Sequence, residues 1–239
     1  MNPAHSPKQN RLLAALPEGC YARLFPHLER VEMPLGSVLH ESDAEMCHIY
    51  FPTTSIVTML QVMDDAACSA IAMVGNESLV GWALIIGEAA MPNRALVQCA
   101  GEGYRITSSL LRAEIDRGGA VLDLLLMHTG ALIAQVVNTA ACNGRHSLEQ
   151  RFCRWLLASL DRYPSKQIGI TQELLADVLG VRREAMGALA RQLGGDGLIR
   201  HGEHWVEVRD RVAVEARTCE CYASLTMEVD RLLTKATQK

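Results

Sequence analysis

Residues 168–194 have the sequence IGITQELLADVLGVRREAMGALARQLG, which predicts two short helices joined by a tight turn. Thr171 is suited to cap the first helix, because its hydroxyl can accept a hydrogen bond from an early backbone N–H. Gly180 ends that helix, since a left-handed conformation costs glycine little. The second helix begins near Arg182, and apolar residues at helical spacing give each helix an inner face. The stretch therefore predicts a helix-turn-helix unit.

The second helix carries charged side chains on its outer face. A helix fits the major groove of DNA, where arginine donates to guanine and glutamate accepts from cytosine. Arg183 and Glu184 lie near the N-terminus of the helix, the end that usually meets base edges. A packed helical hairpin with a solvated charged face is the structural alternative. The residues expected to contact DNA are Arg182, Arg183, Glu184, Arg191, Arg200 and His201.

A β-hairpin is predicted over residues 198–208, directly after the two helices. Three motifs, Ile170-Thr-Gln-Glu, Gly180-Val-Arg-Arg-Glu-Ala-Met-Gly and Gly197-Leu-Ile, then resemble the winged-helix end of the Crp/Fnr family of bacterial transcription regulators. Members commonly read DNA with an Arg-Glu pair and another Arg four residues after the Glu. Arg183 and Glu184 match the pair, whereas Ala188 departs from the pattern at the third position. The half-site sequence that is usual for the family therefore cannot be carried over to this chain.

The overall composition limits the function classes. With 239 residues, 49% of them hydrophobic, the chain is long enough for two modest domains. Its formal net charge of −4 excludes DNA binding by bulk attraction, so locally placed arginines must contact the phosphates. Residues 1–17 show no export signal, which predicts a cytoplasmic protein with its eight cysteines reduced.

The order of elements predicts an α+β fold. Short helices are expected over 8–30, and many short strands with turn signals over 31–107, which composition alone assigns to a sandwich or a barrel. The family resemblance implies a double-stranded β-roll like the cyclic-nucleotide-binding domain. We expect the β-roll in residues 1–118, a dimerisation helix and hinge in 119–143, and the winged helix-turn-helix with a C-terminal helical extension in 144–239.

Residues 120–141 are apolar nearly all round, and a membrane span needs about 20 apolar residues. Four polar residues interrupt the run and interfacial anchors are missing, so we expect no membrane. A helix that is apolar on every side is buried on every side, here on the β-domain and on a second subunit. A monomer's central helix is the alternative, and the resemblance favours a homodimer. The expected coiled-coil seam is Leu122, Leu125, Thr129, Leu132 and Val136.

A break in this helix is predicted at Asn143-Gly144, because Asn-Gly does not comfortably continue a helix. The resemblance implies that the DNA-binding part rotates about this hinge. Ser147 and Gln150 form a capping-box pattern for the next helix. Many Crp-like chains end soon after the wing, but here residues 209–239 predict a further helical tail. This tail either braces the DNA-binding part or lengthens the dimer contact.

The resemblance also allows a position-by-position test for cyclic AMP. Gly81 matches the phosphate pocket of responsive members, but Trp82 replaces its glutamate and Arg94 fits only after a shift of one residue. Val136 and Val137 replace the Thr-Ser pair that contacts adenine. An unpaired buried polar group costs about 1–3 kcal/mol, so this pocket is expected to take a small-molecule effector other than cyclic AMP. Trp82 alone is most simply a core residue.

Cofactors, metals and enzymatic activity are not expected. Iron–sulfur members of the family carry N-terminal cysteine clusters, whereas only Cys20 lies there. Cys219 and Cys221 are too close in sequence for the usual zinc spacing, and on one helix they would point apart. No Walker loop, nucleophile elbow or His-Glu-x-x-His motif is present.

These features predict a homodimeric regulator that binds an inverted repeat in double-stranded DNA. RNA polymerase and an unidentified effector are the further candidate partners. The competing class is a small-ligand-binding β-roll module whose helix-turn-helix contacts protein.

Overall fold

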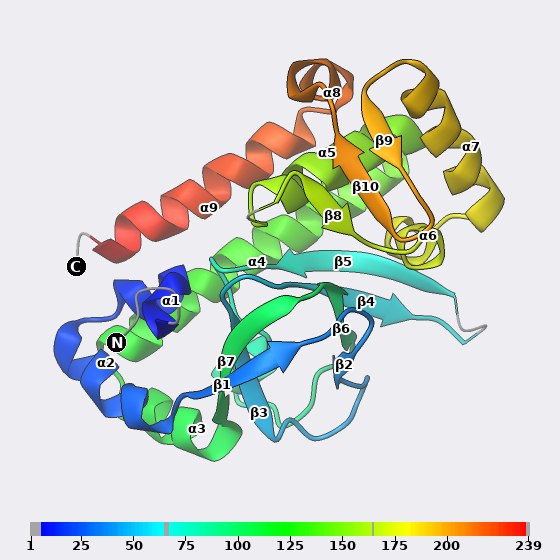
Figure 1. Ribbon diagram of the computed structural model, residues 1–239. Helices are drawn as coiled ribbons and strands as arrows, with labels where there is room; N and C mark the ends of the chain where they lie inside the picture. Colours follow the sequence, from blue (N-terminus) through cyan, green and yellow to red (C-terminus); the bar gives the residue numbers. More distant parts are fainter. Residues whose placement is uncertain (1–5, 65–66, 164, 238–239) are drawn as a thin grey trace.

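The computed structural model describes residues 6–64, 67–163 and 165–237. A β-rich half, a long helix and a mostly helical C-terminal half follow one another along the chain (Figure 1). The chain begins with η2 (Pro7–Gln9), α1 (Arg11–Ala15), α2 (Glu18–Leu24) and η3 (Phe25–His27), which confirms the short helices predicted over 8–30. Asn10 caps α1, and its side chain accepts from the N–H groups of Leu12 and Leu13.

Two antiparallel sheets form the β-domain. One has the strand order β1-β7-β3 and the other β2-β6-β4-β5. The strands are β1 (Glu29–Met33), β2 (Val38–His40), β3 (His48–Pro52), β4 (Ile56–Val62), β5 (Cys68–Val74), β6 (Arg94–Cys99) and β7 (Gly101–Thr107), with η4 (Trp82–Ile86) between β5 and β6. Both sheets contribute to one apolar core, for example Ile49 from β3 and Val97 from β6. The strand-rich region predicted over 31–107 is confirmed.

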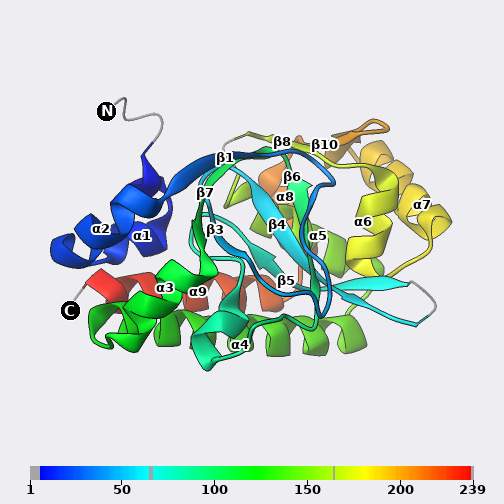
Figure 2. The ribbon, with the colours of Figure 1, turned by 90° about the horizontal axis from the view of Figure 1, so that it is seen from below.

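Helix α3 (Ser108–Asp116) leads into the long helix α4 (Ala120–Arg145), which runs along the β-domain (Figure 2). The predicted seam of α4 is wrong. Leu125, Thr129 and Leu132 are buried within the subunit, because the β-domain and the last helix cover that face. Other apolar side chains of α4 are exposed instead: Leu126 by 49%, Ile133 by 60% and Val137 by 63%.

The predicted break at Asn143-Gly144 is also wrong. Helix α4 continues through both residues to Arg145, and the backbone becomes extended only at His146. A glycine inside a helix costs about 1 kcal/mol relative to alanine, which the hydrogen bonds of the continued helix and its packing can offset. The N–H of His146 still bonds to the carbonyl of Cys142 at 3.0 Å.

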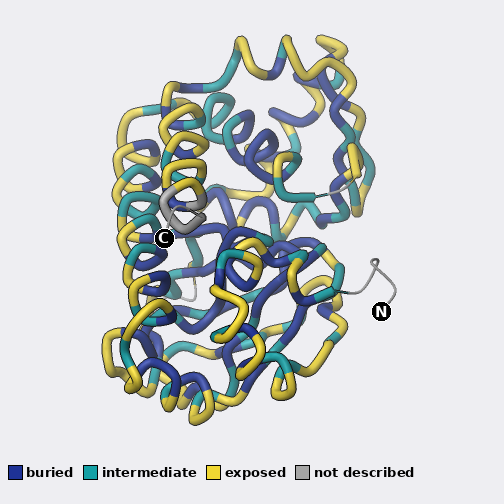
Figure 3. Tube along the Cα trace, turned by 90° about the vertical axis from the view of Figure 1, so that its left-hand side faces the viewer, coloured by how far each residue is buried: buried dark blue, intermediate teal, exposed yellow. Residues whose placement is uncertain are grey.

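By length and composition alone α4 could cross a membrane, and 33% of its most apolar window is buried. Its burial is one-sided, however. Leu124 and Leu132 belong to the core of the β-domain, whereas Ile133 and Val137 are exposed. Figure 3 shows exposed and buried positions alternating along the helices at the edge of the molecule. This pattern is typical of a helix that packs on its own subunit with one face and has a second apolar face free.

The C-terminal half combines helices with a small sheet of order β8-β10-β9. Its elements are α5 (Leu148–Leu160), β8 (Gln167–Gly169), α6 (Gln172–Leu179), α7 (Arg183–Gly195), β9 (Ile199–His201), β10 (Trp205–Val208), α8 (Arg211–Arg217) and α9 (Cys221–Thr237). The capping box of Ser147 and Gln150 at the start of α5 is confirmed. The predicted hairpin over 198–208 is confirmed as β9 and β10.

The residues after β10 form two helices rather than one tail. Helix α8 packs on α5, and α9 packs along α4 and reaches α1 (Figure 1). Leu232 of α9 belongs to the core of the β-domain, whereas Leu225 belongs to the core of the C-terminal half. The extension therefore braces both halves of its own subunit and leaves the exposed face of α4 uncovered.

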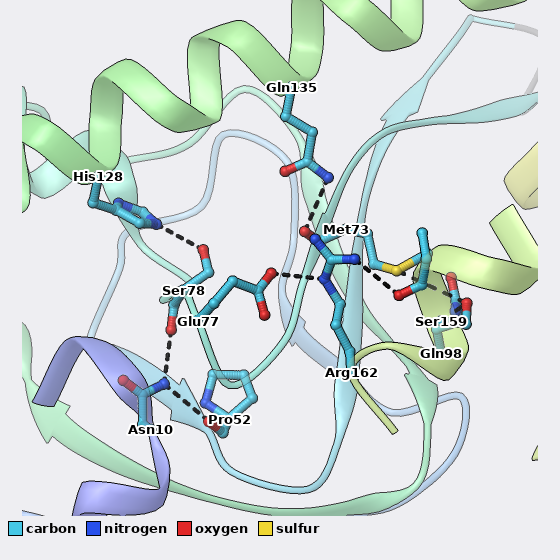
Figure 4. A network of polar contacts seen from close by, with 11 residues as sticks. Asn10, Pro52, Met73, Glu77, Ser78, Gln98, His128, Gln135, Ser159 and Arg162 are labelled. Atoms are coloured by element: carbon cyan, nitrogen blue, oxygen red, sulfur yellow. Dashed lines mark hydrogen bonds and ion pairs between the residues drawn. The ribbon is translucent and has the colours of Figure 1, made fainter. Parts of the chain in front are cut away.

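Buried polar contacts also fasten the two halves together (Figure 4). Arg162, just after α5, pairs with Glu77 of the β-domain at 2.7 Å, and their side chains are only 7% and 6% exposed. Trp155 of α5 donates its indole N–H to Gln98 of β6 at 3.1 Å. Gln135 of α4 donates to the carbonyl of Met73 at 3.1 Å. The first two contacts join the region of α5 to the β-domain and the third joins α4 to it, so polar partners as well as apolar packing specify how these parts are placed.

Candidate nucleic-acid interface

The turn between α6 and α7 has the geometry that its sequence predicts. Thr171 caps α6, and its hydroxyl accepts from the N–H of Leu174 at 3.1 Å. Gly180 ends α6 in the left-handed region, at φ 62° and ψ 45°. A side chain there would be strained, and its Cβ would lie 3.2 Å from the hydroxyl of Ser69 in the β-domain. The glycine thus permits both the tight turn and the close approach of this turn to β5.

Helix α7 is buried on one side and charged on the other. Met186, Leu189, Ala190 and Leu193 are buried, which confirms the predicted inner face. Arg182, Arg183, Glu184 and Arg191 are exposed. At 3.6 residues per turn, Glu184 and Arg191 point directly away from the buried side and Arg183 lies at its flank. Within the described ranges, none of the three arginines forms an ion pair, so their charges remain available to a partner.

The wing residues differ in how they are presented. Arg200 on β9 is exposed, and its guanidinium lies 3.9 Å from Glu207 on the neighbouring strand. His201 is half-buried beside α7, because a Cβ on Gly194 would lie 3.6 Å from its ring. His204 is exposed in the turn between β9 and β10. Arg200 and His204 therefore face solvent, whereas His201 faces α7.

The C-terminal extension does not cover α7. Helix α8 packs on α5, and α9 runs along α4 at the other side of the molecule from α7 (Figures 1 and 2). Of the two helices of this unit, it is α6 that packs on β5 of the β-domain. The outer face of α7 is consequently open along its length, and the helix-turn-helix is held from behind.

The residues predicted for an effector pocket lie in different surroundings. Gly81 has a φ of 115° at the start of η4, and a Cβ there would overlap Ile49. Trp82 packs against the core of the β-domain, as expected for a core residue. The guanidinium of Arg94 is bound by Glu41 at 2.7 Å. Val136 packs on the same core, but Val137 is 63% exposed, since successive helical residues point in different directions.

One cluster of potential metal ligands was not predicted from the sequence. Cys142, His146, Cys219 and Cys221 meet beside the end of α4, with their ligand atoms within 4.8 Å of one another. The prediction that Cys219 and Cys221 bind no metal assumed that both lie on one helix. This assumption is wrong, because Cys219 precedes α9 and Cys221 is its first residue. The available signal was the four-residue spacing of Cys142 and His146, at which two side chains lie on one side of a helix if the helix extends that far.

Comparison with known proteins identifies the C-terminal half. Residues 150–217 match the model of the Crp-like helix-turn-helix domain. Among solved structures, a Crp/Fnr-family transcriptional regulator from Eubacterium rectale has a TM-score of 0.69 at 13% identity and covers 87% of this chain and 98% of its own. Comparison with curated proteins gives no match.

Two further structures are similar over most of the chain. FixK2 from Bradyrhizobium japonicum has a TM-score of 0.67 at 15% identity, covering 80% of this chain and 98% of its own. CLP from Xanthomonas campestris, described as a global regulator responsive to c-di-GMP, has a TM-score of 0.63 at 18% identity, covering 81% and 100%. At these identities the structures establish the fold. The predicted α+β architecture, with a cyclic-nucleotide-binding-like β-domain and a winged helix-turn-helix, is confirmed.

Proposed function

We propose that this chain is a transcription regulator of the Crp/Fnr type, a DNA-binding protein rather than an enzyme, and that it binds an inverted-repeat operator as a homodimer. The match of residues 150–217 to the Crp-like helix-turn-helix domain and the similarity of the whole fold support this proposal. The observation that supports this most is the outer face of α7. Its arginines are exposed and unpaired within the part of the chain described above, and no other element covers them. An exposed helix of this kind fits the major groove.

In the proposed complex, α7 supplies the groups that contact bases. Arg183 donates to guanine, and Glu184 accepts from cytosine, near the N-terminus of the helix. Arg182, Arg191 and Arg200 contact phosphates or further bases, and these contacts supply most of the affinity. His201 is the weakest member of the set, because it is half-buried beside α7.

The second subunit is proposed to bind the exposed face of α4. Along this face six exposed residues recur at alternating intervals of four and three: Leu126, Gly130, Ile133, Val137, Ala140 and Gly144. This is the spacing of a coiled-coil seam, and the glycines and the alanine allow two helices to approach closely. Pairing two copies of α4 across a twofold axis would place their α7 helices for half-sites roughly 34 Å apart.

Cyclic AMP is not the proposed effector. Trp82 stands at the position of the ribose-binding glutamate, and Arg94 is paired with Glu41. Val137 lies on the exposed face of α4 that we propose as the dimer seam. Calorimetry is therefore expected to show no micromolar binding of cyclic AMP, and such binding would contradict the assignment. We also propose that the protein is cytoplasmic. The proposed domains are the β-domain in residues 1–118, the dimer helix from residue 119 and the DNA-binding part from residue 144, and α4 itself ends just before His146.

Selection of bound sequences from a random DNA pool tests the proposal, followed by gel shifts on the selected site. We expect a palindromic consensus. Arg183→Ala should weaken binding to this site by about 1–3 kcal/mol and binding to random duplex much less. Arg112→Ala on α3 removes an equal charge from the β-domain and is the control. Equal losses of affinity for the selected site and for random duplex would mean that Arg183 contacts phosphate rather than a base. Failure to enrich any sequence would refute sequence-specific DNA binding.

A further inference from the structure

Four potential metal ligands converge where α4 ends. The Sγ atoms of Cys142 and Cys219 are 3.6 Å apart, and Sγ of Cys221 lies 3.7 Å from Nδ1 of His146. All four ligand atoms lie within 4.8 Å of one another. The three cysteines are buried and the histidine is half-buried. We propose that these residues bind one divalent cation of the zinc class in a tetrahedral Cys₃His site.

The fold brings these ligands together from distant parts of the sequence. Cys142 lies in the last turn of α4 and His146 directly follows the helix, with its N–H bonded to the carbonyl of Cys142 at 3.0 Å. Cys219 lies in the short link between α8 and α9, and its carbonyl accepts from the N–H of Tyr222 at 3.1 Å. Asn138 of α4 donates to the carbonyl of Cys221 at 3.3 Å, which holds the first turn of α9 on α4. The backbone around each cysteine is therefore positioned without an ion.

The distances fit a single ion. With Zn–S bonds of about 2.3 Å, ligand atoms at the corners of a tetrahedron lie about 3.8 Å apart. An iron–sulfur cluster spreads its four ligands over two or more iron atoms, so some of the ligand atoms would lie much farther apart than 4.8 Å. A disulfide requires about 2.05 Å between sulfurs and would use only two of the four ligands. The arrangement of all four residues is explained by one tetrahedral ion.

A carboxylate supports the histidine from the other side. Nε2 of His146 lies 3.3 Å from a carboxylate oxygen of Glu220, the residue between the two cysteines of the extension. Metal-binding histidines characteristically give their second ring N–H to such a partner, which orients the ring and raises its basicity. Glu220 thus aims Nδ1 of His146 at the three thiols, an arrangement that an ordinary packed histidine does not need.

Positive charge near the cluster complements the proposed site. Three thiolates and one dication carry a net charge of −1. Burial raises the pKa of the Cys142 thiol, and the charge of the nearby Arg154 opposes this shift. The Nε atoms of Arg154 and its neighbour Arg151 are buried, and neither has a hydrogen-bond partner within the described residues. The positive charges of these two arginines are complementary to the anionic site that a zinc-class ion forms with three thiolates.

The ion would hold the start of α9 against the end of α4. Cys142 and Cys219 enclose α5, α6, α7 and the wing between them, so the ion closes the loop that contains the whole DNA-binding part. It also fixes the start of α9, which braces both cores. We therefore expect metal removal to lower the thermal stability of the entire chain, because binding free energy to a site absent from the unfolded chain is folding free energy.

The test measures metal directly. Full-length protein, purified with a reducing agent and without chelators, is analysed by native mass spectrometry and elemental analysis. We expect one zinc ion per chain and a higher Tm than in the chelator-treated protein. Replacement by Co²⁺ should give the intense visible bands of tetrahedral thiolate coordination. The double variant Cys219→Ser with Cys221→Ser should lose the ion, whereas Cys99→Ala, a buried cysteine outside the cluster, should keep it.

A second variant avoids the risk of misfolding. The Glu220 side chain is 79% exposed, so Glu220→Gln should leave the fold intact and weaken zinc binding about 10- to 100-fold, as expected for the partner of a metal-bound histidine. Wild-type protein that binds neither Zn²⁺ nor Co²⁺ under reducing conditions would overturn the proposal. So would a Cys142–Cys219 disulfide without metal, or equal loss of metal from Cys99→Ala. Each of these results leaves the proposed DNA binding untouched.

Discussion

The pair Glu77–Arg162 offers a sharp test of how the two halves are held together. Its atoms are 2.7 Å apart and both side chains are more than nine-tenths buried. At an effective dielectric constant near 20, the attraction at this distance is about 6 kcal/mol, part of which offsets the loss of hydration. Glu77→Ala leaves the guanidinium buried without its carboxylate. Breaking a buried pair in this way costs about 3–5 kcal/mol.

The assay is urea unfolding of the full chain, followed by circular dichroism and tryptophan fluorescence. Trp155 is a suitable reporter, because it bonds to Gln98 beside the same boundary. Glu77→Ala should lower the free energy of unfolding by about 3–5 kcal/mol. The double variant Glu77→Leu with Arg162→Met should recover much of this loss, since both buried charges are then removed. Glu18→Ala breaks the exposed pair with Lys8 and should cost less than about 1 kcal/mol.

A loss for Glu77→Ala no larger than that for Glu18→Ala would refute the reasoning. It would mean that water reaches Arg162 in the folded protein and that the pair behaves as a surface pair. A double variant as unstable as the single one would assign the loss to packing rather than to the unpaired charge.

Three further predictions address the interface, the dimer and pH. Arg191→Ala should lower the salt dependence of DNA binding by about one unit of log–log slope, and an unchanged slope would remove Arg191 from the phosphate contacts. Ile133→Lys should give monomers in light scattering, because it brings like charges together in the seam; Ile86→Lys, an equally exposed isoleucine of η4, should stay dimeric. Burial lowers the pKa of His128 to about 4. The unfolded chain, with a pKa of about 6.5, then binds more protons between these values, so stability should fall as pH drops through this window by about 3 kcal/mol. His128→Asn should abolish that slope in urea unfolding, and an unaltered slope would show that other groups cause it.

Local sequence signals predicted the helix-turn-helix correctly. Thr171 and Gly180 act through hydrogen bonds and dihedral angles within a few residues, so their effect does not depend on the rest of the fold. The same holds for the capping box at Ser147. The exposed charges of α7 followed from the position of its apolar residues, because helical periodicity fixes both faces together.

Predictions that depended on distant packing were less successful. The seam of α4 was assigned to Leu125 and Leu132, but α9 and the β-domain bury this face, and periodicity cannot tell which partner covers which face of an apolar helix. The break at Asn143-Gly144 was also wrong, because a glycine lowers helix stability by only about 1 kcal/mol and α4 continues through it to Arg145. The contact between Cys142 and Cys219 joins residues that are 77 positions apart in the sequence, and no local pattern predicts such a contact.

The position of α9 also has a consequence for biosynthesis. This helix follows the other described elements in order of translation, yet Leu232 completes the core of the β-domain and Leu225 that of the DNA-binding part. Earlier segments emerge from the ribosome first and fold with that apolar surface still uncovered. Nascent chains should therefore remain sensitive to protease and bind chaperones until α9 has been synthesised. On a ribosome stalled before α9, neither half should show the protease resistance of the mature protein.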